Sequence, residues 1–332
     1  MQRRRGGGEP RRDTNEHEWR GGAGREFLDT MKELRKVLVA GGSGLIGTAL
    51  RRELAARGWN VMRLVRREAR TAEEVSWEPA RGEMMRGVME EVDAVVNLSG
   101  ENVGAGRWTP ARKEAILRSR VDATRTLVEA MRRAQKKPGV LVNASAVGIY
   151  GDRGDEVLSE GAKKGEGFLA EVCRAWEAEA QAAEREGVRA AILRLGVVLA
   201  KEGGALAKML PVFRAGIGGK VGSGKQWMSW VSLDDAVAGL RWAVEEERAA
   251  GVFNLAAPAP VRNEEFTKTL GRVLKRPVVM PVPAVVVKAV FGQMGEEALL
   301  GSQRAMPERL WAAGFEFRYA ELEGALRATL GR

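Results

Sequence analysis

The chain has 332 residues and a formal charge of +10, but it contains only one histidine, one cysteine and two tyrosines. The one histidine, His17, lies in an Arg- and Gly-rich N-terminal stretch, so we expect none in the folded part. These counts exclude a Ser-His-Asp triad, a Cys-His pair and a His-ligated zinc site, and with Cys173 alone they exclude an internal disulfide or a thiolate metal cluster.

Cysteine usage and hydropathy bear on where the protein works. A single cysteine is typical of reducing compartments, so we expect a cytoplasmic protein. The longest apolar stretch, residues 277–291, is interrupted by three prolines and Lys288, whereas a membrane span needs roughly 18 apolar residues in a row. We therefore expect a soluble protein without a membrane partner. Residues 1–34 hold too few aliphatic side chains to offset the entropy of ordering and predict a disordered tail, with Met31 as an alternative start of translation.

Short apolar strands alternate with helical patterns from Lys36 onward. Strands are predicted at residues 37–39, 60–65, 93–98, 139–144, 189–195 and 252–255. Helices are predicted to end at Arg57, to begin at Pro110, to cover residues 168–186 and to begin at Asp234. This alternation predicts a Rossmann-type, doubly wound α/β fold over residues 36–257. A small, mainly helical C-terminal domain is expected at residues 280–330.

A glycine-rich turn joins the first strand to the first helix. Gly41 permits the tight turn, Gly44 lets the backbone approach a pyrophosphate, and Gly47 allows the helix to pack on the strand. The N–H groups of the helix N-terminus would bind the phosphates. The predicted site also includes the residues between these glycines: Ser43, Leu45 and Ile46. A glycine triplet alone is weak evidence, but its place in a complete strand–turn–helix–strand unit favours a dinucleotide site.

The end of the second predicted strand indicates which dinucleotide binds. NAD-binding proteins place an acidic residue there to accept from the ribose 2′-hydroxyl. Here the residues are Leu64-Val65-Arg66-Arg67, with no carboxylate before Glu68. Arg66 would pair with a 2′-phosphate, which favours NADP. A solvated arginine pair on a surface turn is the alternative.

Seven segments in order carry a family resemblance. They are AGGSGLIG (40–47), DAVVNLSGENV (93–103), RWTPARKEAILRSRV (107–121), FLAEVCRAWE (168–177), RLGVVLAKEGGAL (194–206), GSGKQWMSWVSLDD (222–235) and PERLWAAGFEFRY (307–319). Together they resemble the YfcH-like branch, family 39U, of the atypical extended short-chain dehydrogenase/reductases, known as epimerase-family proteins. The resemblance extends from Lys36 to the C-terminus and includes that family's small C-terminal domain of unknown function.

The resemblance implies further cofactor contacts. Leu98 and Ser99, with Gly100 beside them, match residues that line the adenosine-ribose side in such proteins. The other matching positions are Glu114, Arg120 and Val197. Glu114 and Arg120 do not share a helix face, so a structural role remains the alternative for each.

The catalytic pair of the wider superfamily is absent. Short-chain dehydrogenases use a Tyr-x-x-x-Lys pair, in which the lysine lowers the pKa of the tyrosine. Tyr150 is followed four residues later by Gly154, and Tyr319 by Glu323. The resemblance places Leu169 and Cys173 where extended members carry the pair.

Two residues remain as catalytic candidates. Ser145 matches the serine that holds the substrate, and Tyr150 lies in a segment that borders the substrate in extended members. Without an adjacent lysine, Tyr150 is expected to be a poor base at neutral pH. Both residues would otherwise pack the floor of the cleft. Residues 226–230 include two tryptophans, which either stack on a ligand or seal the junction between the two parts of the fold. Residues 281–319 form either a helical cap on the substrate side or a protein-interaction surface.

Two functions remain open at this stage. One is an NADP(H)-dependent oxidoreductase or epimerase that acts on an unknown small substrate. The other is a non-catalytic NADPH-binding regulator, since some family members carry cell-division-inhibitor-like names. Nucleic acid is an unlikely partner because no nucleic-acid-binding motif accompanies the positive charge, and no metal is expected.

Overall fold

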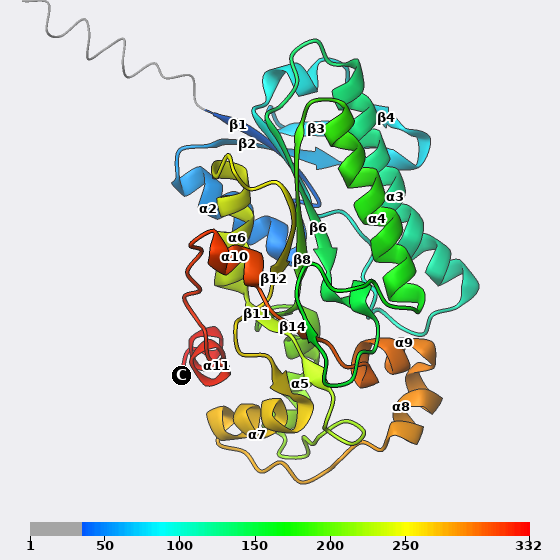
Figure 1. Cartoon of the computed structure of the whole chain (residues 1–332), viewed down its shortest axis with the longest axis vertical. Helices are drawn as coiled ribbons and strands as arrows, with labels where there is room; N and C mark the ends of the chain where they lie inside the picture. Colours follow the sequence, from blue (N-terminus) through cyan, green and yellow to red (C-terminus); the bar gives the residue numbers. More distant parts are fainter. Residues whose placement is uncertain (1–34) are drawn as a thin grey trace, which may run out of the picture. The chain divides into compact units, whose positions relative to one another are not determined.

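The structure is a computed structural model that describes residues 35–332, and an eight-stranded sheet runs through them (Figure 1). The predicted tail and His17 lie outside the described residues. In spatial order the strands are β12 (Gly251–Leu255), β8 (Arg189–Leu195), β6 (Val140–Ala146), β5 (Ala94–Asn97), β1 (Lys36–Ala40), β2 (Asn60–Val65), β3 (Glu74–Glu78) and β4 (Glu83–Met84). Every neighbouring pair is parallel except β3 and β4.

Helices cover both faces of the sheet, as the alternation in the sequence predicts. Helices α2 (Leu45–Ala56) and α6 (Leu233–Glu245) pack on one face, and α3 (Pro110–Arg133) and α4 (Phe168–Arg185) pack on the other. Successive side chains of β1 alternate between the two faces of the sheet. Val37 and Val39 enter the hydrophobic core on the side of α2 and α6, while Leu38 and Ala40 enter the core on the side of α3 and α4. The doubly wound α/β prediction is confirmed.

Local capping decides where the helices begin. Thr109 caps α3 by accepting a hydrogen bond from the Arg112 N–H, so the helix begins at Pro110, as predicted. Helix α6 begins at Leu233 rather than at Asp234, because the Ser232 side chain accepts from the Asp235 N–H. The β3–β4 extension, which follows β2 at the edge of the sheet, was not predicted.

Beyond the sheet the elements are shorter and largely helical. The helices are α5 (Gly204–Arg214), α7 (Asn263–Leu274), α8 (Ala284–Phe291), α9 (Gln293–Gly295), the π-helix η4 (Glu296–Leu300), α10 (Glu308–Ala312) and α11 (Leu322–Leu330). The 3₁₀ turns are η1 (Pro79–Arg81), η2 (Val88–Glu91) and η3 (Val147–Tyr150). Three two-stranded sheets join β7 (Val157–Leu158) to β14 (Arg304–Ala305), β9 (Val197–Leu199) to β11 (Trp230–Ser232), and β10 (Trp227–Met228) to β13 (Val261–Arg262).

The C-terminal region returns to the sheet instead of forming a detached body. Strand β14 pairs with β7, and Leu310 of α10 belongs to the same core as α2 and α6. Residues 35–332 accordingly form one compact unit. None of the described helices has the length and hydrophobicity needed to cross a bilayer.

Candidate functional site

A cavity of about 470 Å³ opens where the strand order reverses, between β1 and β5. Ligands of open α/β sheets bind at this position, outside the carboxyl ends of the strands. The turn after β1 and the ends of β2 and β5 contribute most of the wall. Its lining residues are Gly41, Ser43, Gly44, Arg63, Leu64, Val65, Arg66, Arg67, Trp77, Pro79, Leu98, Ser99, Gly100, Glu101, Ser119 and Ala123.

The three glycines of the turn have different roles. Gly41 has φ +72°, and a Cβ there would lie 2.6 Å from the Leu98 backbone. A Cβ at Gly47 would lie 2.3 Å from the Gly41 carbonyl oxygen, so the approach of helix to turn requires glycine. At Gly44, φ is −72° and a Cβ would meet only the Gly41 oxygen, at 3.4 Å. The fold therefore requires Gly41 and Gly47, whereas Gly44 leaves space on the cavity side.

The N-terminus of α2 faces this cavity, and no side chain among the described residues accepts a hydrogen bond from its first N–H groups. Its first turn carries no acidic residue. Helices α3 and α6 are instead capped by Thr109 and Ser232. Free N–H groups and the positive end of the helix dipole favour an anion such as a pyrophosphate.

Three arginines lie at the end of β2. Two of them, Arg63 and Arg67, bind the Glu74 carboxylate, and Arg66 does not. Arg67 binds Glu74 through two hydrogen bonds of 2.7 and 2.8 Å, and Arg63 binds the same carboxylate. The Glu74 side chain is 1% exposed, and its contacts with Arg67 and the Arg70 N–H lower its pKa to about 2. Arg66 is exposed and, among the residues described, forms no ion pair. Among the lining residues of the cavity, Arg66 is the arginine without a carboxylate partner in the part of the chain that the structure describes.

The structure brings most of the predicted cofactor residues together. Seven of them line this one cavity: Gly41, Ser43, Gly44, Arg66, Leu98, Ser99 and Gly100. Leu45, Ile46 and Gly47 follow in the first turn of α2, where the side chain of Ile46 packs into the core. Leu45 packs against Gly203, whose Cβ would lie 3.3 Å from it.

Three residues implied by the resemblance lie away from the cavity lining. Glu114 is exposed and pairs with Arg118 at 2.8 Å. Val197 belongs to β9 and donates its N–H to the Ser229 carbonyl. Arg120 lies behind the wall: it donates to the Glu101 carbonyl at 3.1 Å, and a Cβ at Gly100 would lie 2.7 Å from its guanidinium carbon. Arg120 therefore supports the loop after β5, and desolvation lowers its pKa.

Sequence reasoning missed several lining residues. Trp77 and Pro79 come from β3 and η1, and Ser119 and Ala123 come from α3. The only signal for β3 is the short apolar alternation around Trp77, which is too brief to distinguish a strand from a loop.

Ser145 and Tyr150 lie in one buried polar network. Ser145 Oγ donates to Glu177 at 2.8 Å, and Glu177 accepts two hydrogen bonds from Arg194, at 2.7 and 2.8 Å. Arg194 also donates to the Tyr150 hydroxyl at 2.9 Å, and that hydroxyl lies 2.7 Å from Asn254 Oδ1. Tyr150 is 0% exposed and Ser145 is 3% exposed. Burial raises the pKa of Tyr150. The buried network favours a structural role for Tyr150, which is the alternative that the sequence left open beside a catalytic one.

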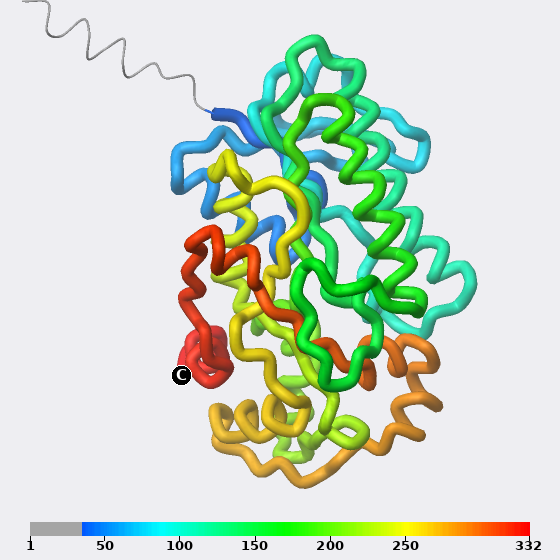
Figure 2. The backbone as a smooth tube through the Cα atoms, in the orientation of Figure 1, coloured from blue at the N-terminus to red at the C-terminus, as the bar shows by residue number. Residues whose placement is uncertain are grey.

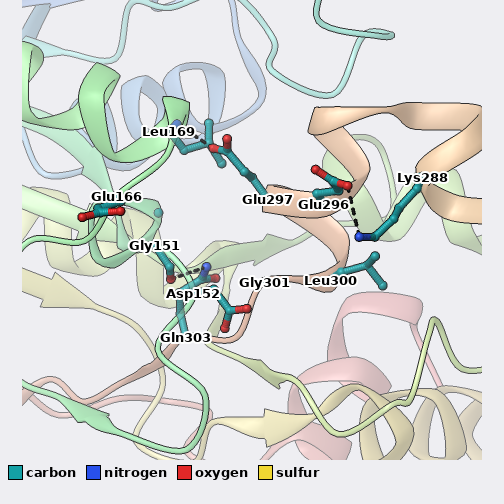
Figure 3. A pocket seen from close by; sticks show the side chains of 11 residues that line it. Gly151, Asp152, Glu166, Leu169, Lys288, Glu296, Glu297, Leu300, Gly301 and Gln303 are labelled. Carbon is teal, nitrogen blue, oxygen red and sulfur yellow. Dashed lines mark hydrogen bonds and ion pairs between the residues drawn. The ribbon is translucent and has the colours of Figure 1, made fainter. Parts of the chain in front are cut away.

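A second cavity, of about 340 Å³, lies beyond η3 at the N-terminus of α4 (Figure 3). It is lined by Gly148, Gly151, Asp152, Glu166, Leu169, Lys288, Glu296, Glu297, Leu300, Gly301 and Gln303. The Glu297 carboxylate accepts from the N–H groups of Phe168 and Leu169, at 3.0 and 2.9 Å, and so caps α4. Lys288 pairs with Glu296 at 3.2 Å. Within residues 35–332, no group of His, Cys, Asp or Glu side chains is arranged to hold a metal ion.

Comparison with known proteins agrees with this geometry. The family model described as the NAD dependent epimerase/dehydratase family matches residues 37–256. The chain belongs to this family. A second model, a domain of unknown function (DUF1731), matches residues 282–329.

Similar proteins cover almost the whole described chain. An epimerase family protein of Mycobacterium bovis, Mb2239, is 43% identical over 290 residues, which are 87% of this chain and 96% of the relative. The crystal structure of human epimerase family protein SDR39U1 (isoform 2) with NADPH is 34% identical, with a TM-score of 0.82 over 90% of this chain and 99% of that chain. A nucleoside-diphosphate sugar epimerase from Corynebacterium glutamicum is also 34% identical, with a TM-score of 0.74 over 92% of this chain and 61% of that chain.

In this epimerase/dehydratase family chain, the two positions matched to the Tyr-x-x-x-Lys pair hold apolar or inert groups. Leu169 lines the second cavity. Cys173 is buried beside Ser145, and desolvation raises the pKa of its thiol to about 11, so it is not a thiolate at neutral pH. The two tryptophans of residues 226–230 differ in environment: Trp230 is 0% exposed, and the half-buried Trp227 donates from Nε1 to Asp155 at 2.7 Å.

Proposed function

We propose that this epimerase/dehydratase family protein binds NADP(H) in the cavity between β1 and β5 and prefers it to NAD(H). The observation that carries the proposal is that Glu74 neutralises two of the three arginines at the end of β2 and leaves Arg66 available for a ligand. The carboxylate is buried against Arg63 and Arg67 and cannot accept from a ribose 2′-hydroxyl, while Arg66 stays unpaired at the cavity wall. The human relative, SDR39U1, is described as a structure with NADPH, which supports the same preference.

The residues that would hold the cofactor can be assigned. The first N–H groups of α2 and the space at Gly44 suit the pyrophosphate, and Arg66 suits a 2′-phosphate. Leu98 and Ser99 line the wall at the end of β5. When bound, the cofactor supplies or accepts a hydride.

The reaction proposed is oxidation–reduction or epimerisation of a small substrate, with a proton-transfer set different from that of the superfamily. The alternative is a non-catalytic NADPH-binding regulator, and three observations favour it. The Ser145 proton is committed to Glu177, the Tyr150 hydroxyl has no exposure, and Leu169 stands in place of the tyrosine. No nucleic-acid partner is part of either proposal, and the single cysteine favours a reducing compartment such as the cytoplasm.

The cofactor proposal is tested by calorimetric titration with NADPH and NADH. A charge-assisted contact to phosphate contributes about 1.5–3 kcal/mol, so Arg66→Asp should lose a factor of about ten to a hundred in NADPH affinity while NADH affinity changes little. Arg52→Asp, at an exposed arginine of α2, is the matched control. Unchanged NADPH selectivity in Arg66→Asp would refute the proposal.

The two functions are separated by turnover. Wild-type protein is incubated with NADPH or NADP⁺ and a panel of aldehydes, quinones and nucleotide sugars. Oxidation of NADPH, or conversion of a nucleotide sugar to its epimer, that Ser145→Ala slows at unchanged thermal stability supports the enzyme. Stoichiometric NADPH binding without turnover across the panel supports the regulator.

A further inference from the structure

Exposed apolar side chains are concentrated in two stretches, residues 212–217 and 279–291. Eight of the eleven large apolar side chains that are exposed in residues 35–332 belong to them: Val212, Ile217, Val279, Met280, Val285, Val286, Val290 and Phe291. Val285 is 77% exposed and Val279 is 64% exposed. On α8 only Val287 is buried. A helix with apolar residues on its outer side is unusual for a surface that only meets water.

The two stretches form one continuous surface. Gly218 pairs with Val278 and Val221 with Val282, in parallel bridges. Farther along, a Cβ at Gly222 would lie 3.8 Å from the Ala284 side chain at the start of α8. Figure 2 shows residues 275–283, in orange, running along the lower edge of the view from α7 to α8. We call this surface the apolar ridge and define it by the exposed residues Ile217, Val279, Met280, Val285, Val286, Val290 and Phe291.

Unpaired cations lie beside the apolar ridge. Arg214 ends α5, and Lys275 and Arg276 follow α7, whose chain then runs directly into the ridge. All three are exposed, and none forms an ion pair within the described residues. A Cβ at Gly216 would lie 3.4 Å from Pro277, which places the ends of α5 and α7 next to each other.

The acidic residues nearby are mostly neutralised. Glu264 binds Lys268 at 2.6 Å and Lys220 at 3.8 Å, and Glu296 binds Lys288. Glu265 is the remaining exposed carboxylate at the start of α7. Residues 1–34 hold eight basic and seven acidic side chains, so +9 of the formal charge lies in the described part of the chain.

We propose that the apolar ridge docks on the surface of an anionic phospholipid bilayer. Helix α8 lies in the interfacial plane with its valines and Phe291 among the acyl chains, while Arg214, Lys275 and Arg276 contact headgroup phosphates. Short apolar side chains bordered by unpaired cations are the combination that binds anionic interfaces. Attachment of this kind needs no spanning helix, so it is compatible with the absence of a long apolar stretch but departs from the expectation, drawn from the sequence, of no membrane partner. It goes beyond the cofactor site.

The experiment is co-sedimentation of the full chain with vesicles of phosphatidylcholine containing phosphatidylglycerol, compared with vesicles of phosphatidylcholine alone. We expect binding to the anionic vesicles that weakens as salt rises, because the attraction is screened beyond a Debye length. Each cation replaced in Arg214→Ala, Lys275→Ala and Arg276→Ala should weaken binding about fivefold.

Variants of the apolar side chains make the test specific. Val285→Glu with Val290→Glu should weaken binding at least about tenfold, since two apolar groups are removed from the interface. Val285→Trp should strengthen it, because tryptophan favours the membrane interface. Val157→Glu, at a valine that is 49% exposed outside the ridge, is the matched control and should bind like wild type.

Three results would overturn the proposal. They are absence of binding to anionic vesicles, equal binding to neutral vesicles, and sedimentation as a dimer that Val285→Glu with Val290→Glu dissociates. The last result would assign the ridge to a second copy of the chain. NADPH titration of the same variants is independent of each outcome, because the ridge does not line the cofactor cavity.

Discussion

Glu177 and Arg194 form a two-point ion pair between α4 and β8, with both side chains almost completely excluded from solvent. The pair connects Ser145 on one side to Tyr150 on the other. The polar groups nearest to the expected reaction centre are thus satisfied by one another, and they hold a helix to the sheet.

Replacing one partner of this pair should destabilise the fold. Glu177→Gln leaves the Arg194 charge buried and uncompensated, and we expect a loss of about 3–5 kcal/mol in the free energy of unfolding. Urea denaturation measures it. Glu171→Gln, at an exposed carboxylate of the same helix, should change stability by less than about 0.5 kcal/mol. A Glu177→Gln variant as stable as wild type would contradict the structural role.

Alanine variants of two glycines in the turn should have different effects, one on the stability of the fold and the other on NADPH binding. Gly47→Ala places a Cβ against the Gly41 carbonyl oxygen and should cost about 1–3 kcal/mol or more of stability. Gly44→Ala has an ordinary φ and no such clash, so it should cost less than about 1 kcal/mol yet weaken NADPH binding. Thermal melts and titration of both variants provide the comparison. If Gly44→Ala bound NADPH normally, the pyrophosphate would not lie there.

Tyr150→Phe should behave as a stability variant. It removes the hydroxyl that Arg194 and Asn254 contact, and leaving these buried groups without a partner costs about 1–3 kcal/mol. NADPH affinity should stay unchanged, and so should any turnover corrected for folded protein. A loss of turnover at full stability would restore Tyr150 as a catalytic candidate.

Glu74 gives the protein a pH dependence at the acid end. Its pKa is lowered from the ordinary value of 4.5 to about 2. Its stabilising contribution is therefore complete above the ordinary value and is lost as pH falls through about 2. Glu74→Gln should therefore be less stable than wild type at neutral pH, and the difference should shrink in acid. Denaturation at several pH values measures this. A difference that does not change with pH would place the effect elsewhere.

The glycine turn and Arg66 at the cavity wall were predictable from the sequence because both depend on local geometry. Gly41 and Gly47 satisfy steric requirements that lie within one turn, and Arg66 follows directly from the end of a strand. The partners that determine which arginine remains free were not predictable. Glu74 reaches Arg63 and Arg67 from β3, a strand with no clear periodic signal.

The surroundings of the two catalytic candidates were not predictable because these residues contact partners that are distant in the sequence. Ser145 lies within β6, which extends past the predicted strand end at residue 144, and Tyr150 ends η3 directly after it. Their environment is made by Glu177, Arg194 and Asn254 from three other elements. Burial of a tyrosine by such partners leaves no local pattern in the sequence.

The Glu297 carboxylate has a consequence for how the chain can be divided. It belongs to the segment matched as a domain of unknown function, yet it satisfies the first amides of a helix in the epimerase-matched segment. A truncation after residue 257 would leave those amides without their acceptor and remove β14 from its partner strand. The two matched segments are therefore not interchangeable modules: a chimera that exchanged one of them would also have to supply its cap.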